Sequence, residues 1–276
     1  MRYTLTIPQD AMRGMSGYQL SNAAGSSLDF KDFREYEQGD DLRRIDWNAY
    51  ARSDKLVVKL YREEVNPHLD LLLDTSRSID LPNTQKIAGI LKLAGLFSTA
   101  AENAKCSLKT WTAGNLIQPV KNGNHAASMW EEIKFDGTTS ASEAINLPPP
   151  PRWRRHGIRL LLSDLLWEAD PLLFLRPFAD GAAALHIIQL LSQQEISPNI
   201  RGNSRLEDLE SGAEPEVFID AVTERRYSEA LAQHQNQWHN ACQQVGATFT
   251  VITAEDMLET NLRLTSMEKA RILEAI

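Results

Sequence analysis

The chain has 276 residues, of which 42% are hydrophobic and 24% are charged, and its formal net charge is −8 at pH 7. This composition is typical of a soluble globular protein with one large domain or two small ones, and the negative charge argues against general binding to nucleic acid or to anionic membranes. No apolar run approaches the roughly 18 residues of a membrane span, and the apolar start is too short for a signal peptide. Only two cysteines occur, which is typical of a reducing compartment. We therefore expect a cytoplasmic protein.

The N-terminal segment differs in character from the rest of the chain. Residues 1–66 are polar, contain glycine and many charges, and show no long helical period. Turn-forming residues gather at 36–46, and the apolar residues 56–61 are typical of a strand. We expect residues 1–66 to form a β-rich segment that packs on a main domain of residues 67–276.

From residue 67 onward, strand and helix patterns alternate, which is typical of a mostly parallel sheet flanked by helices. Apolar runs predict strands at 69–73, 157–164, 183–191 and 247–252, and a short strand pair at 107–113 and 116–120. Helical patterns cover 84–103, 126–133, 170–178 and 227–245. The alternation is interrupted at 195–226, where we expect a β-hairpin insertion, and short helices are expected to close the chain.

The strand at 69–73 runs directly into Asp74, Ser76 and Ser78. In open α/β sheets, ligands bind beyond the carboxyl ends of the strands, so one carboxylate and two hydroxyls are expected to meet there. Hard oxygen ligands of this kind suit Mg²⁺ or Mn²⁺. The spacing has a second interpretation, because Asp and Ser are common in turns and Asp74 could cap the helix that follows.

Two later segments supply further oxygen atoms. Thr138 and Thr139 lie in a glycine-containing loop, and Asp164 ends the second long apolar strand. Together with the first motif, these residues resemble the metal-ion-dependent adhesion site of von Willebrand factor A domains. Thr139 fits the family's threonine better than Thr138, because it stands five residues before Ala144.

The resemblance implies a von Willebrand factor A-like, Rossmann-like α/β fold with one bound divalent cation. It implies that Ser76, Ser78 and Thr139 hold Mg²⁺ or Mn²⁺ directly, whereas Asp74 and Asp164 act partly through bound water. It also implies one open position on the ion, which takes a carboxylate from a protein partner.

A second pattern lies in the N-terminal segment and can be paraphrased as R-x-Y-x-x-G-D-D-x-R-x-I-D-W, followed by A-R, an apolar strand and an acid. The residues that fill it are Arg34, Tyr36, Gly39, Asp40, Asp41, Arg43, Ile45, Asp46, Trp47, Ala51, Arg52 and Glu63 or Glu64. Together with residues 206–212, this pattern resembles the hallmark of a bacterial domain-of-unknown-function family, DUF58, which is a branch of the von Willebrand A-like proteins. The resemblance spans nearly the whole chain. It implies work alongside a MoxR-type AAA+ ATPase in the assembly or maturation of other proteins.

The signature places three aspartates close to three arginines in the sequence. Because Arg pairs bidentately with carboxylates, the simplest interpretation is an ion-pair network that fixes this turn-rich segment or docks a partner. Gly39 supplies turn freedom, and Trp47 is expected to anchor in the core. Alternatively, Asp40 and Asp41 are metal ligands or an acid–base pair, although nearby arginines keep carboxylates ionised and disfavour a general acid.

Other catalytic signatures are missing from the sequence. There is no glycine-rich phosphate loop, no H-E-x-x-H motif and no recognisable nucleophile–histidine spacing. His186 is expected to be a buried, hydrogen-bonded histidine, and the basic run 152–156 a solvated loop or a contact for an acidic partner. We therefore expect a non-enzymatic, metal-dependent protein-binding module. The alternatives are a metal-dependent hydrolase that uses the strand-end oxygens plus Asp40 or Asp41, and a metal-free scaffold in which the Arg77 cation takes the place of the ion.

Overall fold

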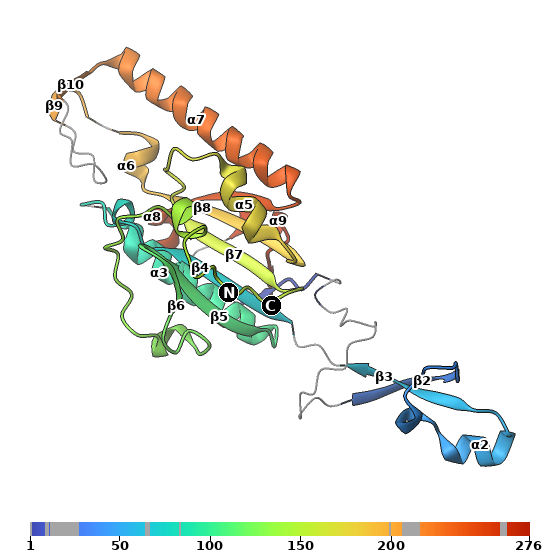
Figure 1. The fold of residues 1–276 in the computed structure, drawn as a ribbon. Coiled ribbons are helices and arrows are strands. Elements are labelled where there is room, and N and C mark those ends of the chain that lie inside the picture. Colours follow the sequence, from blue (N-terminus) through green and yellow to red (C-terminus); the bar gives the residue numbers. More distant parts are fainter. Residues whose placement is uncertain are drawn as a thin grey trace. The chain divides into compact units, whose positions relative to one another are not determined.

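The computed structural model describes residues 2–8, 11, 28–63, 67–82, 84–198, 200–205, 216–259 and 264–276. The chain divides into two compact units, one formed by residues 1–11 and 67–276 and the other by residues 12–66 (Figure 1). The first eleven residues therefore group with the C-terminal part of the chain rather than with the N-terminal signature. Within the described residues, no helix combines the length and apolar character needed to cross a membrane.

A six-stranded sheet forms the centre of the larger unit. Its order is β11-β8-β7-β4-β5-β6, and all neighbouring strands are parallel except β5 and β6. The strands are β4 (His68–Asp74), β5 (Ser107–Ala113), β6 (Ile117–Pro119), β7 (Ile158–Ser163), β8 (Ala184–Leu191) and β11 (Thr248–Thr253). The predicted mixed α/β architecture with a mostly parallel sheet is confirmed.

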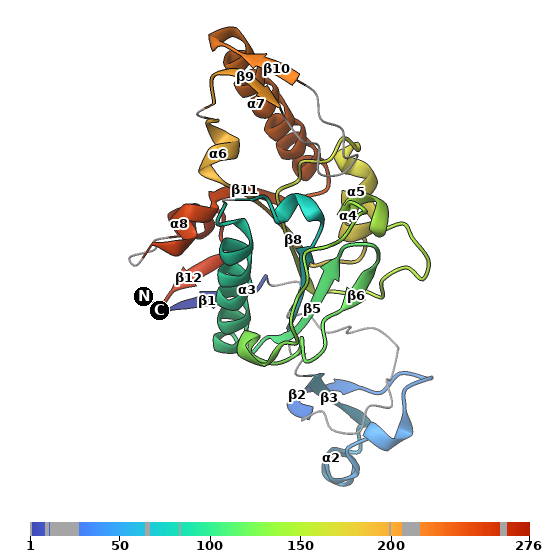
Figure 2. The same ribbon diagram turned by 90° about the vertical axis from the view of Figure 1, so that its left-hand side faces the viewer.

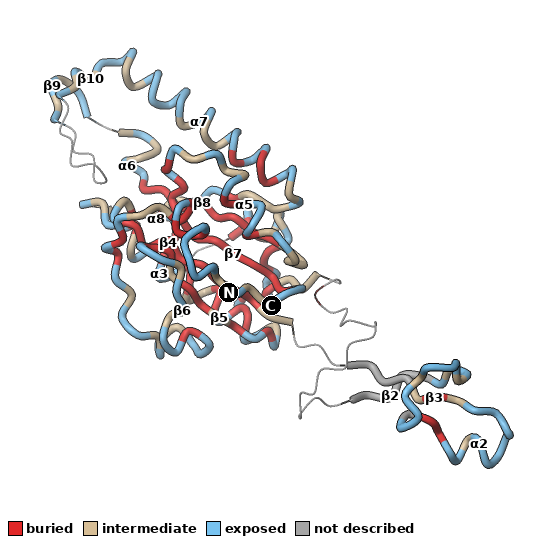
Figure 3. The backbone as a smooth tube through the Cα atoms, in the orientation of Figure 1, coloured by how far each residue is buried: buried red, intermediate tan, exposed pale blue. Residues whose placement is uncertain are grey.

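Alternate side chains of the central strands face two separate cores. Leu71 and Leu73 pack on one face with α3 (Lys86–Asn103), α8 (Ala254–Leu258) and α9 (Thr265–Lys269). Leu72 packs on the other face with α5 (Pro171–Ala179) and α7 (Ala221–Gln244). Figures 2 and 3 show the helices on both sides and the burial of the strands between them. Because helices cover both faces of the sheet, the sequences of the central strands are nearly unbroken apolar runs.

The path of the chain creates a switch point between β4 and β7. After β4, the chain passes through α3 to β5 on one side, and it later returns to place β7 on the other side of β4. The helices that follow these two strands, α3 and α5, lie on opposite faces of the sheet. In open α/β sheets, such a point leaves a crevice at the carboxyl ends of the strands. The residues after β4 and β7 therefore meet where ligands are expected to bind.

A hairpin and part of a helix project from this sheet. β9 (Gly202–Arg205) and β10 (Glu216–Ile219) pair antiparallel, as the predicted insertion requires, while residues 206–215 lie outside the described residues. The following helix α7 buries Trp238, Ala241 and Cys242 near its C-terminal end. Its N-terminal part, together with β9 and β10, extends beyond the sheet (Figures 1 and 3). We call β9, β10 and residues 221–234 the arm.

Two local predictions require correction, and one strand pairing was not predicted. The expected helix at 126–133 is only a short 3₁₀ turn, η3 (Ala127–Met129), because Trp130 is extended and its Nε1 donates to the His125 carbonyl at 2.9 Å. Helix α7 begins at Ala221 instead of 227, because the carboxylate of Asp220 accepts a hydrogen bond from the Thr223 N–H. The strands β1 (Tyr3–Leu5) and β12 (Leu273–Ala275) pair antiparallel, which local patterns do not predict.

The basic run 152–156 is also tied to the fold more closely than expected. Asp70, near the start of β4, is fully buried, and its carboxylate lies 3.3 Å from the guanidinium of Arg154. The same carboxylate accepts a hydrogen bond from Trp111 Nε1 at 3.2 Å. Arg154 also donates to the Leu69 carbonyl at 2.7 Å. Arg154 thus compensates a buried charge at the amino end of the sheet, away from the carboxyl edge.

His186 is buried, as predicted, and its Nδ1 lies 2.7 Å from Thr248 Oγ1 on the neighbouring strand. Burial lowers the pKa of His186 from its usual 6.5 to about 4, because the charged imidazole is poorly solvated there.

This shift predicts acid destabilisation. The neutral histidine is compatible with the fold above the unfolded-state pKa, so stability is full there and is lost as pH falls through the interval from 6.5 to about 4. Between about pH 7 and about pH 5, His186 should cost ~2 kcal/mol of unfolding free energy. Urea denaturation of wild type and His186→Gln at both values measures this cost. An equal loss of stability in both proteins would contradict the assignment.

Candidate functional site

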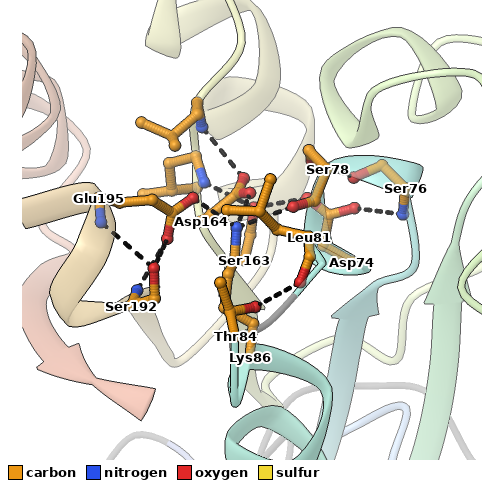
Figure 4. Close-up of polar contacts among 12 residues, drawn as sticks. Asp74, Ser76, Ser78, Leu81, Thr84, Lys86, Ser163, Asp164, Ser192 and Glu195 are labelled. Atoms are coloured by element: carbon orange, nitrogen blue, oxygen red, sulfur yellow. Dashed lines mark hydrogen bonds and ion pairs between the residues drawn. The ribbon is translucent and has the colours of Figure 1, made fainter. Parts of the chain in front are cut away.

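Asp74 joins the two central strands at the switch point. Its Oδ2 accepts a hydrogen bond from Ser163 Oγ at 2.6 Å, and its Oδ1 accepts one from the Ser76 backbone N–H at 2.9 Å (Figure 4). Asp74 is the last residue of β4 and Ser163 the last of β7, and both are completely buried. The Asp74 carboxylate therefore bridges the ends of β4 and β7 and also fixes the turn that follows β4.

The turn after β4 brings two hydroxyl groups together. The Oγ atoms of Ser76 and Ser78 lie 2.9 Å apart. Ser76 begins the 3₁₀ turn η2 (Arg77–Ile79), and Ser78 is only partly buried. The predicted gathering of Asp74, Ser76 and Ser78 at this strand end is present.

The loop that carries the two candidate threonines runs beside this turn. Gly137 forms a parallel bridge with Ser76, its carbonyl accepts from the Arg77 N–H at 2.9 Å, and its N–H donates to the Thr75 carbonyl at 3.1 Å. Thr138 follows, and both its N–H and its Oγ1 bond to Asn115 Oδ1 at 2.9 Å. The Thr138 hydroxyl is thus engaged away from the serines.

Thr139, two residues after the bridged Gly137, is partly buried. The structure brings its loop to the serine turn, and its role as an ion ligand stays a prediction.

Asp164, the residue after β7, contacts a buried lysine. Its Oδ2 lies 2.7 Å from Lys86 Nζ, and its Oδ1 accepts from the Leu166 N–H at 3.2 Å. Lys86 Nζ also lies 2.7 Å from Glu195 Oε1 and donates to the Ser78 carbonyl at 2.9 Å. Lys86 is fully buried although it opens helix α3. One ammonium group therefore connects the serine turn, the end of β7 and α6 (Gln193–Ile196).

The electrostatics of the cluster follow from burial and charge. Burial raises the pKa of Asp74 to about 6, and the nearby charge of Asp164 adds to this effect, while hydrogen bonds from Ser163 and Ser76 oppose it. Burial also disfavours the charged form of Lys86, but the adjacent Asp164 and Glu195 carboxylates outweigh burial and raise the lysine pKa. Lys86 therefore remains an ammonium ion at neutral pH.

The alternative in which the Arg77 cation replaces the ion gains no support from the geometry of the site. The Arg77 side chain is exposed, and the cation that contacts Asp164 is Lys86. Sequence reasoning missed Lys86, Ser163 and Glu195. Two signals existed. Lys86 is a charged residue at the start of a largely apolar helix. The S-x-x-E spacing of Ser192 and Glu195 is typical of a capping box, which the structure contains. Neither signal indicates which distant partner the charge meets.

The oxygen atoms at this edge are of the kind that hard divalent cations prefer. Among the residues that the structure describes, no three His, Cys, Asp or Glu side chains come together in a group that could hold a metal ion. An ion beside Asp74 and Asp164 would therefore depend on the hydroxyls of Ser76 and Ser78 and on water. Mg²⁺ commonly keeps several waters and uses only one or two carboxylates, so this donor set fits it.

In the smaller unit, β2 (Leu28–Glu35) and β3 (Val57–Glu63) pair antiparallel, and η1 (Leu42–Arg44) and α2 (Trp47–Ser53) connect them. Arg34 binds the Asp40 carboxylate at 2.7 Å and lies 3.3 Å from Glu37. A hydrogen bond from the Glu37 N–H, followed by the contact with Arg34, lowers the pKa of Asp40. Gly39 lies in the turn between them with φ +115°, a conformation that favours glycine.

The other signature aspartates act mainly as helix caps. Asp41 accepts from the Arg43 N–H at 3.0 Å and caps η1. Asp46 accepts from the Asn48 and Ala49 N–H groups and caps α2, and its cation partner is Lys59 at 3.4 Å. Of the three aspartates and three arginines predicted to pair, Arg34 and Asp40 form an ion pair within the described residues 28–63. Arg52 Nε instead donates to the Asn48 carbonyl at 3.1 Å.

The expectation that Trp47 anchors in the core is wrong. It is 61% exposed and packs edge-on against Tyr50, which is also exposed. The indole therefore does not anchor in a core. Tyr36 is partly buried next to the turn. Glu63 ends β3, while Glu64 lies outside the described residues.

These observations place the chain among α/β proteins with a mostly parallel, Rossmann-like sheet and polar residues at its switch point. The model of a family described as "Protein of unknown function DUF58" matches residues 32–237, and the chain belongs to this family. The DUF58 resemblance of the N-terminal signature is thereby confirmed.

The chain is similar to uncharacterized proteins of mycobacteria. It is 24% identical over 245 residues to Rv1480 of Mycobacterium tuberculosis and, equally, to Mb1516 of Mycobacterium bovis, covering 84% of this chain and 76% of each relative. Among solved structures, conserved hypothetical protein BatB from Bacteroides thetaiotaomicron matches with a TM-score of 0.34 and 7% identity, covering 75% of this chain and 96% of that one. An aerotolerance-related membrane protein from Bacteroides fragilis matches with a TM-score of 0.32 and 10% identity, covering 74% and 96%.

The close approach of Gly137 predicts a large effect of one methyl group. A Cβ at this position would lie 2.6 Å from Gly114 Cα and 3.0 Å from the Thr75 carbonyl, both backbone atoms. Gly137→Ala should destabilise the protein by about 1–3 kcal/mol in thermal or urea unfolding. The matched control is Gly95→Ala in α3, where the nearest atom is 3.7 Å away and a gain of up to ~1 kcal/mol is expected from helix propensity. Equal effects of the two substitutions would contradict this packing.

Removal of the Lys86 ammonium should leave the buried Asp164 and the partly buried Glu195 without their cation. Lys86→Met is expected to cost about 3–5 kcal/mol in chemical denaturation. The control is Lys121→Met, because Lys121 forms an exposed pair with Glu131 at 3.3 Å and should contribute less than about 1 kcal/mol. A small cost for Lys86→Met would mean that the buried cluster is more solvated than its geometry indicates.

Proposed function

We propose that this protein is a non-enzymatic protein-binding module that binds a carboxylate of its partner through a divalent cation. In this proposal, the larger unit is a von Willebrand factor A-like domain, and Mg²⁺ or Mn²⁺ binds at the carboxyl edge between β4 and β7. The observation that carries the proposal is the meeting of Asp74, Ser76, Ser78 and Asp164 at the switch point.

The spacing of the two hydroxyls supports direct coordination. Around Mg²⁺, oxygens lie about 2.0–2.1 Å from the ion in octahedral geometry, so two adjacent ligands are about 2.9 Å apart. The Ser76 and Ser78 Oγ atoms have this separation of 2.9 Å. An ordinary hydrogen bond has a similar length, so the spacing supports the site only in combination with the carboxylates.

The charge of the cluster supports a divalent ion. Asp74, Asp164 and Glu195 supply three acidic groups, whereas Lys86 is the one cation and pairs with Asp164 and Glu195 among the described residues. Among the described residues, no second Lys or Arg side chain is bonded to these three carboxylates. With all three acids ionised, two positive charges are lacking. Two positive charges are what Mg²⁺ or Mn²⁺ would supply, and uncompensated buried carboxylates are costly.

A metal-free scaffold is the second candidate, because Lys86 already contacts Asp164. In that case the ammonium group substitutes for the ion on the β7 side of the site. The charge count argues against it, since one lysine compensates only one of the three acids.

Calorimetric titration with Mg²⁺ and with Mn²⁺ tests the metal site. Wild type should release or absorb heat with a single-site stoichiometry, and Asp74→Ala and Ser76→Ala should bind the ion at least about tenfold more weakly, because each removes an oxygen from the set. The control is Ser107→Ala, at the opposite end of the strands. A wild type that gives no binding heat at millimolar Mg²⁺ would favour the metal-free scaffold.

The partner chemistry has its own test. A MoxR-type AAA+ ATPase, the partner that the family resemblance implies, should co-purify with the chain in Mg²⁺ and be lost on chelation, and Asp74→Ala should reproduce the loss. Retention of the ATPase after chelation would mean that the ion does not hold this partner.

A further inference from the structure

We infer that Lys86 is a permanent counter-cation of the metal site. When the ion binds, the Lys86 ammonium group stays in place, gives up its contact with Asp164 and keeps its contact with Glu195. The inference rests on the proposed function and adds a link between ion binding and the contact of α3 with α6. It assigns roles to two residues, Lys86 and Glu195, that lie outside the predicted ligand set.

Lys86 contacts two carboxylates, one at the proposed ion site and one on α6. Its Nζ lies 2.7 Å from Asp164 Oδ2, in the proposed ion shell, and 2.7 Å from Glu195 Oε1, on α6. A third contact is made to the carbonyl of Ser78 at 2.9 Å. Lys86 is thus held by the same turn and the same acid that would face the ion.

A divalent cation beside Asp164 would repel this ammonium group. The two positive charges would compete for one carboxylate, and the buried setting makes their repulsion stronger than in water. Glu195 offers Lys86 a second carboxylate partner at an equal distance of 2.7 Å, so the lysine need not leave its buried position. Asp164 would then be free to face the ion, while Lys86 and Glu195 form a closer pair.

Glu195 is itself firmly positioned. Its Oε2 accepts from the Ser192 N–H at 2.7 Å and from Ser192 Oγ at 2.9 Å, which completes the capping box of α6. The carbonyl of Glu195 accepts a hydrogen bond from Tyr227 OH at 2.5 Å, and Tyr227 belongs to the arm. A tighter Lys86–Glu195 pair would therefore stabilise α6, which lies between β8 and the arm in the chain (Figure 1).

Two substitutions separate this role from simple structural pairing. Glu195→Gln leaves the ammonium group with Asp164 alone, so Mg²⁺ must compete with an undivided lysine and should bind roughly tenfold more weakly. Lys86→Met combined with Glu195→Gln removes one positive and one negative charge together. It leaves Asp164 unshared at the same net charge, so Mg²⁺ should bind at least as tightly as in wild type.

The experiment is calorimetric titration of the full chain with Mg²⁺, with folding of each variant checked by thermal unfolding. The matched control is Lys121→Met combined with Glu131→Gln, the same chemical change in an exposed pair, which should leave the Mg²⁺ affinity unchanged. A second measurement is hydrogen exchange of residues 193–197, which Mg²⁺ should slow in wild type and not in Glu195→Gln.

The outcomes distinguish the two hypotheses. Unchanged Mg²⁺ affinity in Glu195→Gln, with normal binding by wild type, would overturn the counter-cation role and leave the metal site intact. Absence of binding by wild type would overturn the proposed function and this inference together. Gain of binding only in the double variant would identify Lys86 as a replacement for the ion, which also overturns the inference.

Discussion

The hydrogen bond from Ser163 Oγ to Asp74 Oδ2, 2.6 Å long, joins the ends of the two central strands, and the arrangement of the candidate site depends on it. Asp74 can bridge β4 and β7 because these strands are parallel neighbours in the sheet and end side by side, with Leu73 paired to Leu162. The same carboxylate holds the Ser76 N–H, so one buried acid sets both the strand ends and the turn that presents the serine hydroxyls. The buried Asp74 carboxylate therefore fixes both the strand ends of the fold and the geometry of the candidate site.

The charge balance of this edge connects stability with the proposed function. Burial, and then the nearby Asp164, raise the pKa of Asp74, and Lys86 contacts both Asp164 and Glu195. A protein selected for stability alone could fill these positions with apolar side chains of similar volume at little cost. The retention of several buried acids at a strand edge is typical of functional sites, where local stability is exchanged for ligand chemistry.

Much of the fold could be predicted because its signals are local. Buried parallel strands appear as unbroken apolar runs, and the order of strands and helices indicates a doubly wound sheet. The pairing of β1 with β12 could not be predicted, because three-residue strands at distant positions carry no periodic signal. Trp47 was misplaced for a related reason, since an aromatic side chain anchors in a core only if the surrounding elements cover it, and α2 buries none of its side chains.

The sequence by itself determined which residues stand at the strand ends, because Asp74, Ser76, Ser78 and Asp164 follow apolar runs whose length and composition define their own termini. It also determined family membership, through a signature whose residues act largely within a short stretch. Only the tertiary structure decided which cation meets these acids. Arg77 is adjacent in sequence but exposed, whereas Lys86 and Glu195, 109 residues apart, meet across elements because a buried charge must find its partner in space.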